Sequence, residues 1–150
     1  MHRLKNQIKD LKQQGYYVIL CPHWGILYFY RNLRQHRMAI WMVRECGPDL
    51  IIGHGSHMAG EIHRIDGTWI LYSIGNFIFN NEGLYRHFSS PPFSFIVNLH
   101  VDLSPPKHLK KLEIFPIFID NQKTGFQPRF VDEEEFMHIS TLTRLSSYNP

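Results

Sequence analysis

The chain has 150 residues, of which 43% are apolar and 19% are charged, with a formal net charge of +3. These values exclude a disordered chain and fit one folded domain with a buried core. Positive charge is slight and scattered, so we expect no nucleic-acid partner. No apolar run reaches the ~18 to 20 residues that a membrane span needs. Two cysteines, Cys21 and Cys46, are too few for a disulfide framework and are interpreted as small buried apolar residues.

Helices and strands alternate in the first half of the chain. Residues 3–14 have helical spacing and end at Gly15, and residues 16–21 are an apolar run typical of a strand covered on both faces. Residues 33–46 are predicted to form a second helix, and residues 49–53 a second buried strand. Such a unit places the two strands parallel. Because no strand precedes the first helix, the sequence is interpreted as beginning partway through a fold.

Antiparallel strands dominate the second half. The predicted elements are a hairpin of strands 61–65 and 68–73, a polar loop at 80–92, strands 93–103 and 112–119, a turn at 120–122 and a helix at 132–145. A parallel unit followed by antiparallel strands predicts an α/β fold with a mixed sheet.

Two of the apolar strands end in loops that carry histidine and glycine. His23 follows the first strand, within Pro22-His23-Trp24-Gly25, and His54 and His57 follow the second, within Gly53-His54-Gly55-Ser56-His57. Open α/β sheets build sites at this carboxyl edge, and imidazole is a common metal ligand. We therefore predict that the three histidines converge on a metal centre. In the structural alternative, His23 caps a loop, His54 bonds a neighbouring strand and His57 is solvated.

Two further features lie near these loops. A third glycine-bearing strand exit, Ile74-Gly75-Asn76-Phe77, follows the predicted hairpin. In a structural reading, Asn76 simply tolerates a left-handed turn. An aromatic cluster within residues 22–32 consists of Trp24, Tyr28, Phe29 and Tyr30. These rings either form the floor of a substrate cleft or pack in the core, and the sequence favours packing.

Together, the three strand exits resemble the bacterial capsule-synthesis protein CapA family. This is the poly-gamma-glutamate synthesis group, which is related to calcineurin-like metallophosphoesterases. The resemblance rests on an HWG exit at residues 23–25, a GHxxH exit at 53–57 and an S-x-G-N-F exit at 73–77, and it covers roughly residues 16–80. It implies the C-terminal half of a calcineurin-like metallophosphoesterase α/β sandwich. Residues 1–150 would then be a single partial domain without its N-terminal half.

The same resemblance implies a site and an activity. His23, His54 and His57 match metal-ligating histidines, and Asn76 matches an asparagine expected to have a positioning role. The implied activity is metal-dependent, phosphoesterase-like hydrolysis. The implied cofactor is divalent Mn, Fe or Zn, with up to two ions in the complete protein. The implied substrate is a cell-envelope polymer or a phosphoester.

The chain departs from the family pattern in two ways. Gly55-Ser56 stands where the family commonly has His-Pro, which predicts a more flexible loop at His57. The acidic and asparagine ligands of the family's first half are absent, and Asp49, Glu61 and Asp66 lie in the wrong places to replace them. Histidines alone cannot hold two cations together against their repulsion.

We therefore expect the isolated chain to be inactive and to hold one metal weakly or none. An N-terminal half or another capsule-synthesis subunit would be its partner. The alternative is a non-catalytic binding or assembly module that keeps the fold. The sequence leaves the compartment open between the cytoplasm and an outward-facing membrane anchor.

Overall fold

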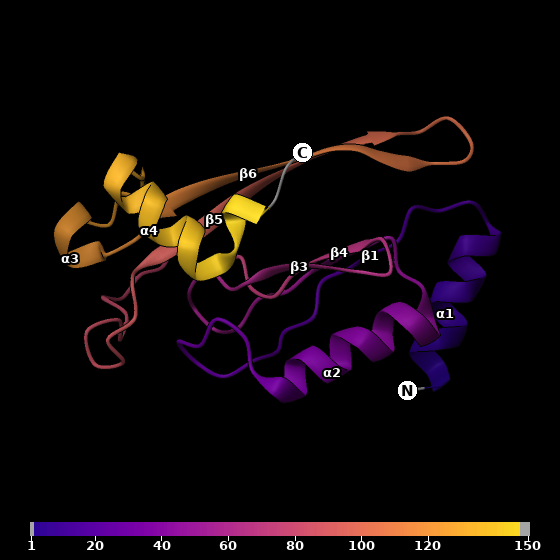
Figure 1. Cartoon of the computed structure of the whole chain (residues 1–150), viewed down its shortest axis with the longest axis horizontal. Coiled ribbons are helices and arrows are strands. Elements are labelled where there is room, and N and C mark those ends of the chain that lie inside the picture. Colours follow the sequence, from indigo (N-terminus) through magenta and orange to yellow (C-terminus); the bar gives the residue numbers. More distant parts are fainter. Residues whose placement is uncertain (1, 148–150) are drawn as a thin grey trace.

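The computed structural model describes residues 2–147 (Figure 1). In chain order the elements are α1 (His2–Gln13), β1 (Ile19–Leu20), α2 (Leu33–Trp41), the π-helical turn η1 (Met42–Cys46), β2 (Leu50–Ile52), β3 (Ile62–Ile65), β4 (Thr68–Leu71), β5 (Phe93–Asp102), β6 (His108–Phe118), α3 (Asn121–Thr124), β7 (Arg129–Phe130), α4 (Glu133–Thr143) and the 3₁₀ turn η2 (Leu145–Ser147). None of the helices formed by these residues is long and apolar enough to cross a bilayer.

Two sheets make up the fold. In the first, the strand order is β1-β2-β4-β3, with β1, β2 and β4 parallel and β3 antiparallel to β4. The second contains β5, β6 and β7, all antiparallel. Figure 1 places α2 along one side of the first sheet and the β5–β6 hairpin with α4 on the other. The predicted α/β fold, with a mixed sheet followed by antiparallel strands, is confirmed.

Apolar side chains of β2 and β4 point alternately to the two faces of the first sheet, and a hydrophobic core lies on each face. Leu50 of β2 and Leu71 of β4 join the core shared with Phe93 and Phe95 of β5. Their chain neighbours point the other way, because successive strand residues face opposite sides of a sheet. This second core is formed with α2 and η1, and its buried members are Ala39, Met42, Val43, Ile51, Ile70 and Tyr72.

The helix that joins the first two strands has well-defined ends. Asn32 caps α2 through a reciprocal capping box with Gln35, in which each side chain bonds the other residue's backbone N–H. The last turn widens into η1 and stops at Gly47, which has a φ of 70°. The predicted helix 33–46 and its glycine stop are confirmed.

The first strand differs from its prediction. Only Ile19 and Leu20 join the ladder, and β1 is an edge strand of the described sheet. Ile19 is 36% exposed and Tyr16 52% exposed, so the prediction of a strand covered on both faces was wrong. Before the ladder begins, the backbone N–H of Val18 donates to the Asp49 carboxylate instead of a strand carbonyl. An apolar run indicates a strand, but whether its side chains are buried depends on which elements pack against them.

Several local predictions also need correction. Cys46 is buried as expected, but Cys21 is exposed, because it lies beyond the last β1 ladder residue. The strand predicted at 112–119 begins earlier, at His108. The predicted turn at 120–122 runs into the short helix α3, which Asp120 caps by accepting a hydrogen bond from the Gln122 N–H. Strand β7 was not predicted.

Candidate functional site

The three strand exits meet at the carboxyl edge of the first sheet. His23 and His54 pair as an isolated parallel bridge beyond β1 and β2. The backbone N–H of Trp24 donates to the His54 carbonyl at 2.9 Å, and the backbone N–H of His54 donates to the Pro22 carbonyl at 3.1 Å. The Ile74 N–H after β4 donates to the Gly53 carbonyl at 2.9 Å. Main-chain bonds therefore continue past the strands and fix the loops side by side.

His23 and His54 are in direct contact. Their ring centroids lie 5.1 Å apart with an interplanar angle of 85°. His23 is exposed and His54 is half-buried. Neither ring has a hydrogen-bond partner among residues 2–147. The structure thus brings two of the three predicted histidines together, with both rings open to further contacts.

Gly55 gives the His23 ring its space. A Cβ on Gly55 would lie 3.0 Å from His23 Cε1 and 3.1 Å from its Nδ1, and the φ of +110° is itself unfavourable for any side chain. The next residue, Ser56, is buried, and its hydroxyl donates to the Met58 carbonyl at 3.0 Å. The sequence predicted a more flexible loop here, but Gly55 fits a close approach and Ser56 is anchored.

His57 has different neighbours. Its Nδ1 lies 2.9 Å from Asn76 Oδ1, and its ring stacks on Tyr28 at a centroid distance of 6.0 Å. Phe79 contacts the same ring at 5.5 Å. His57 has a φ of 65° and Tyr28 a φ of 59°, both in the left-handed region that costs non-glycine residues energy. Two strained residues thus face each other at this point.

Asn76 reaches His57 because of the glycine before it. Gly75 has a φ of +77°, and a Cβ there would collide with the side chain of Ser94 on β5. The Ser73 hydroxyl accepts a hydrogen bond from the Gly75 N–H at 3.1 Å. The turn after β4 is therefore fixed both by conformation and by packing, and it presents Asn76 to the loop after β2.

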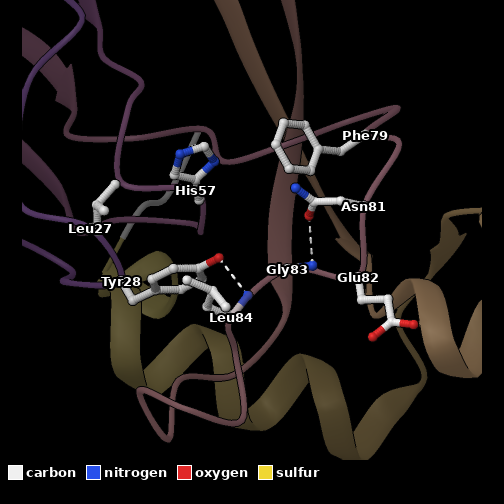
Figure 2. Close-up of a pocket in the computed structure, with 8 residues that line it drawn as sticks. All are labelled: Leu27, Tyr28, His57, Phe79, Asn81, Glu82, Gly83 and Leu84. Carbon is white, nitrogen blue, oxygen red and sulfur yellow. Dashed lines mark hydrogen bonds between the residues drawn. The ribbon is translucent and has the colours of Figure 1, made fainter.

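A pocket of about 540 Å³ opens beside His57 (Figure 2). Its lining residues are Leu27, Tyr28, His57, Phe79, Asn81, Glu82, Gly83 and Leu84. The Tyr28 hydroxyl accepts a hydrogen bond from the Leu84 N–H at 2.7 Å, which ties the loop after residue 80 to the aromatic loop after β1. Most of this wall was missed by sequence reasoning, because residues 80–92 carry no motif.

The aromatic cluster divides between the two roles considered for it. Trp24 packs on Tyr72 with ring centroids 5.9 Å apart, and its indole N–H donates to the Tyr72 carbonyl at 2.8 Å. Gln35 Nε2 donates to the same carbonyl at 3.2 Å. A Cβ on Gly53 would collide with the Trp24 indole and the Tyr72 carbonyl. Trp24 therefore supports the site from beneath, whereas Tyr28 lines the pocket.

A polar network lies behind the site, on the α2 side of β4. His36 Nδ1 is 2.5 Å from the buried Tyr72 hydroxyl, whose pKa is raised by burial to about 12. His63 Nε2 lies 2.6 Å from the Glu61 carboxylate, which also accepts a bond from Arg31 Nε at 2.9 Å.

Burial lowers the pKa of His63, and its bond to Glu61 only partly offsets this effect. Burial also lowers the pKa of His36. For Glu61, burial acts to raise the pKa, but the bonds from Arg31 and His63 outweigh it and lower the pKa. Both histidines are therefore hydrogen-bonded within the fold, His36 to Tyr72 and His63 to Glu61.

The donor set does not amount to a metal site within this part of the protein. Residues 2–147 contain no group of three or more His, Cys, Asp or Glu side chains placed to hold one ion. A catalytic zinc site has three protein ligands and an open position. His23 and His54 supply two adjacent imidazoles, and His57 is engaged with Asn76. The described residues alone therefore do not fit the predicted metal, and the convergence of all three histidines stays a prediction.

Comparison with known families places these loops in context. Residues 1–81 match the family described as bacterial capsule synthesis protein PGA_cap. The chain belongs to the PGA_cap family. The match includes all three strand exits and part of the pocket, and it ends before residues 82–84 of the pocket wall. The predicted CapA-type resemblance is thereby confirmed.

A curated relative is also named for PGA biosynthesis. The PGA biosynthesis protein CapA of Bacillus subtilis (strain 168) is 38% identical to this PGA_cap chain over 74 residues. The aligned region covers 49% of this chain and 19% of the Bacillus protein. The chain thus matches about a fifth of the length of that relative.

Proposed function

We propose that this chain forms the histidine-bearing part of a hydrolase-type site in capsule-polymer biosynthesis, with His23, His54, His57 and Asn76 as its site residues. One observation carries the proposal: His23 and His54 come from separate strands, yet their ring centroids meet at 5.1 Å on one sheet edge. This is the edge at which open α/β sheets build their sites. Membership of the PGA_cap family supports the capsule-polymer setting.

The proposed site requires ligands from outside residues 2–147. Two imidazoles are in contact here, whereas a catalytic metal needs at least three protein ligands. We propose that the missing carboxylates belong to an N-terminal half of the complete domain or to another capsule-synthesis subunit. The cofactor would be divalent manganese, iron or zinc, with up to two ions in the complete protein. The chain on its own would be inactive.

The proposed substrate is a cell-envelope polymer or a phosphoester. Two observations support a substrate role for this edge. The Bacillus relative is named for PGA biosynthesis. The pocket beside His57 measures about 540 Å³, within the ~300 to 1,000 Å³ typical of small-molecule sites.

A second candidate is a non-catalytic binding or assembly module. The incomplete ligand set favours it, and so does the apolar character of the pocket rim. Leu27 is 47% exposed and Leu84 is 55% exposed, and both line the pocket. Exposed apolar side chains gathered around a cavity are a common feature of interaction surfaces.

Thermal and chemical unfolding separates the two candidates when Zn²⁺ or Mn²⁺ is titrated to high concentration, because two imidazoles alone bind a metal weakly. If the paired histidines are ligands, metal at about ten times its Kd should raise the free energy of unfolding by about 1.4 kcal/mol. His23→Ala and His54→Ala should each abolish this gain. His108→Ala is the matched control, because His108 is an exposed histidine at the start of β6.

The opposite result supports the binding module. In that case metal changes the stability of no variant, and His54→Ala unfolds at the same denaturant concentration as the wild type. Stabilisation that disappears in His108→Ala and persists in His54→Ala would contradict the proposed site outright.

A further inference from the structure

The side chains of His57, Asn76 and Tyr85 form a closed ring of hydrogen bonds together with the His57 backbone carbonyl. His57 Nδ1 lies 2.9 Å from Asn76 Oδ1, and Asn76 Nδ2 donates to the Tyr85 hydroxyl at 3.0 Å. The Tyr85 hydroxyl donates to the backbone carbonyl of His57 at 3.1 Å, which closes the ring. The members come from the loops after β2 and β4 and from the loop at residues 80–92.

The direction of every proton in this ring follows from one group. A backbone carbonyl can only accept, so the Tyr85 O–H must point at the His57 carbonyl. The tyrosine oxygen then offers a lone pair to Asn76, which must turn its NH₂ toward Tyr85. The Asn76 oxygen consequently faces His57, and a bond there requires a proton on Nδ1. The neutral imidazole thus carries its proton on Nδ1 and a lone pair on Nε2.

Tyr85 is suited to this task because its proton is retained. Its side chain is 6% exposed, and burial raises the pKa of the phenol well above its usual value of about 10. Tyr28 packs edge-on against the Tyr85 ring, with centroids 5.2 Å apart, and stacks on His57. The hydroxyl therefore stays a donor at any ordinary pH, and the rings around it fix its position.

We propose that Tyr85 is a positioning residue that acts through Asn76 to hold His57 in the Nδ1–H tautomer. Nε2 then has no hydrogen-bond partner among residues 2–147 and is available to accept a proton or bind a cation. Histidines at metal sites are commonly oriented in this way, with the distal N–H donating to a protein oxygen. The use made of Nε2 rests on the proposed function, whereas the tautomer itself is a property of this chain.

Nitrogen-15 NMR of the His57 ring tests this directly in the metal-free protein. The spectra are recorded over a pH series and compared on its alkaline plateau, where the neutral ring is observed. The wild type should show Nδ1 protonated and Nε2 unprotonated. Tyr85→Phe should lower the ratio of Nδ1–H to Nε2–H by about five-fold, the effect of one net hydrogen bond of ordinary strength.

Tyr30→Phe is the matched control. Tyr30 is a partly buried tyrosine packed against the same cluster, and its hydroxyl bonds none of the ring members. This variant should leave the His57 tautomer unchanged. Asn76→Asp should restore the Nδ1–H tautomer even when combined with Tyr85→Phe, because a carboxylate accepts in either orientation.

Two results would overturn the proposal. One is a wild-type His57 that carries its proton on Nε2. This result does not depend on whether any variant folds. The other is a Tyr85→Phe protein with an unaltered tautomer ratio. Neither depends on metal uptake, so a failed metal titration and a failed tautomer assignment are separate outcomes.

Discussion

The two histidine regions of this sheet edge are built in opposite ways. The rings of His23 and His54 contact each other, and no hydrogen bond from the described residues orients either one. His57, three residues after His54 in the same loop, is held by Asn76 and contacts the rings of Tyr28 and Phe79. The chain therefore preorganises one imidazole completely and leaves two free to adjust. In the proposed site, the two adjustable imidazoles would suit completion by ligands from elsewhere, and His57 would give that site a fixed reference position.

The largest expected effect on the free energy of unfolding comes from the backbone beneath His23 and His54. Gly53→Ala would drive a methyl group into the Trp24 indole and the Tyr72 carbonyl. Because the carbonyl is main chain directly after β4 and is bonded by both Trp24 and Gln35, the clash is hard to relieve, and we expect a loss of about 3 kcal/mol. Urea unfolding monitored by tryptophan fluorescence measures it.

Gly15→Ala is the control for this substitution. Nothing lies within 4 Å of the position that its Cβ would take, and only its φ of +78° is unfavourable. The expected loss is about 1 kcal/mol, the conformational part alone. Equal losses at the two glycines would mean that the backbone beneath His23 and His54 can shift to accommodate the extra methyl group.

The second prediction sets the two regions against each other. Asn76→Ala leaves His57 and Tyr85 without their shared partner, so we expect a loss of about 1 to 3 kcal/mol. His23→Ala removes an exposed ring with no hydrogen bond among the described residues, and should change stability by less than about 0.5 kcal/mol. Chemical denaturation of both variants checks this, and a costlier His23 substitution would reverse the comparison.

A smaller effect is expected from the support under His23. Trp24→Phe keeps the aromatic stacking on Tyr72 but removes the N–H that bonds its carbonyl. Gln35 still donates to that carbonyl, so the expected loss is about 1 kcal/mol. Trp41→Phe serves as the control, since Trp41 is partly buried and its indole has no hydrogen bond to residues 2–147. Urea midpoints of the two variants measure the difference.

The fourth prediction extends the contrast to pH. Burial lowers the pKa of His63 and of His36 in the folded protein. The unfolded chain therefore binds more protons below the ordinary value of about 6.5, and stability declines as the pH falls from there toward the lowered folded pKa. His63→Gln should reduce this decline, and the exposed His108→Gln should not. Unfolding free energies at about pH 8 and about pH 5.5 measure it, and a wild type more stable at the lower pH would contradict the assignment.

Local chemistry made most of the fold predictable. Gly47 identifies a helix end by its conformational preference, and the alternating apolar residues of 93–103 identify the strand β5. The hairpin of β3 and β4 follows from Asp66-Gly67, both at positive φ. The extent of β1 did not follow, because coverage of Ile19 depends on which elements lie beside it rather than on its own apolar character.

The site was predictable where a motif follows a strand and not elsewhere. His23 and His54 meet because parallel strands deliver their loops to one edge. Tyr85 could not be found from the sequence, since it bonds Asn76 and His57 across a loop without regular structure. Tyr85 shares this mostly polar loop with Phe88, and no motif sets Tyr85 apart.

The edge position of β1 has a consequence for handling the protein. A strand with one unpaired side offers main-chain groups to any other chain, which is the usual start of edge-to-edge aggregation. Here only Ile19 and Leu20 are in ladder conformation, so an incoming strand gains few bonds. The exposed Ile19 and Tyr16 side chains work in the opposite direction, by adding apolar contact area. Hydrogen exchange would register this balance as rapid labelling of the outward-facing amides of β1, slowing as protein concentration rises if the edge recruits a second copy.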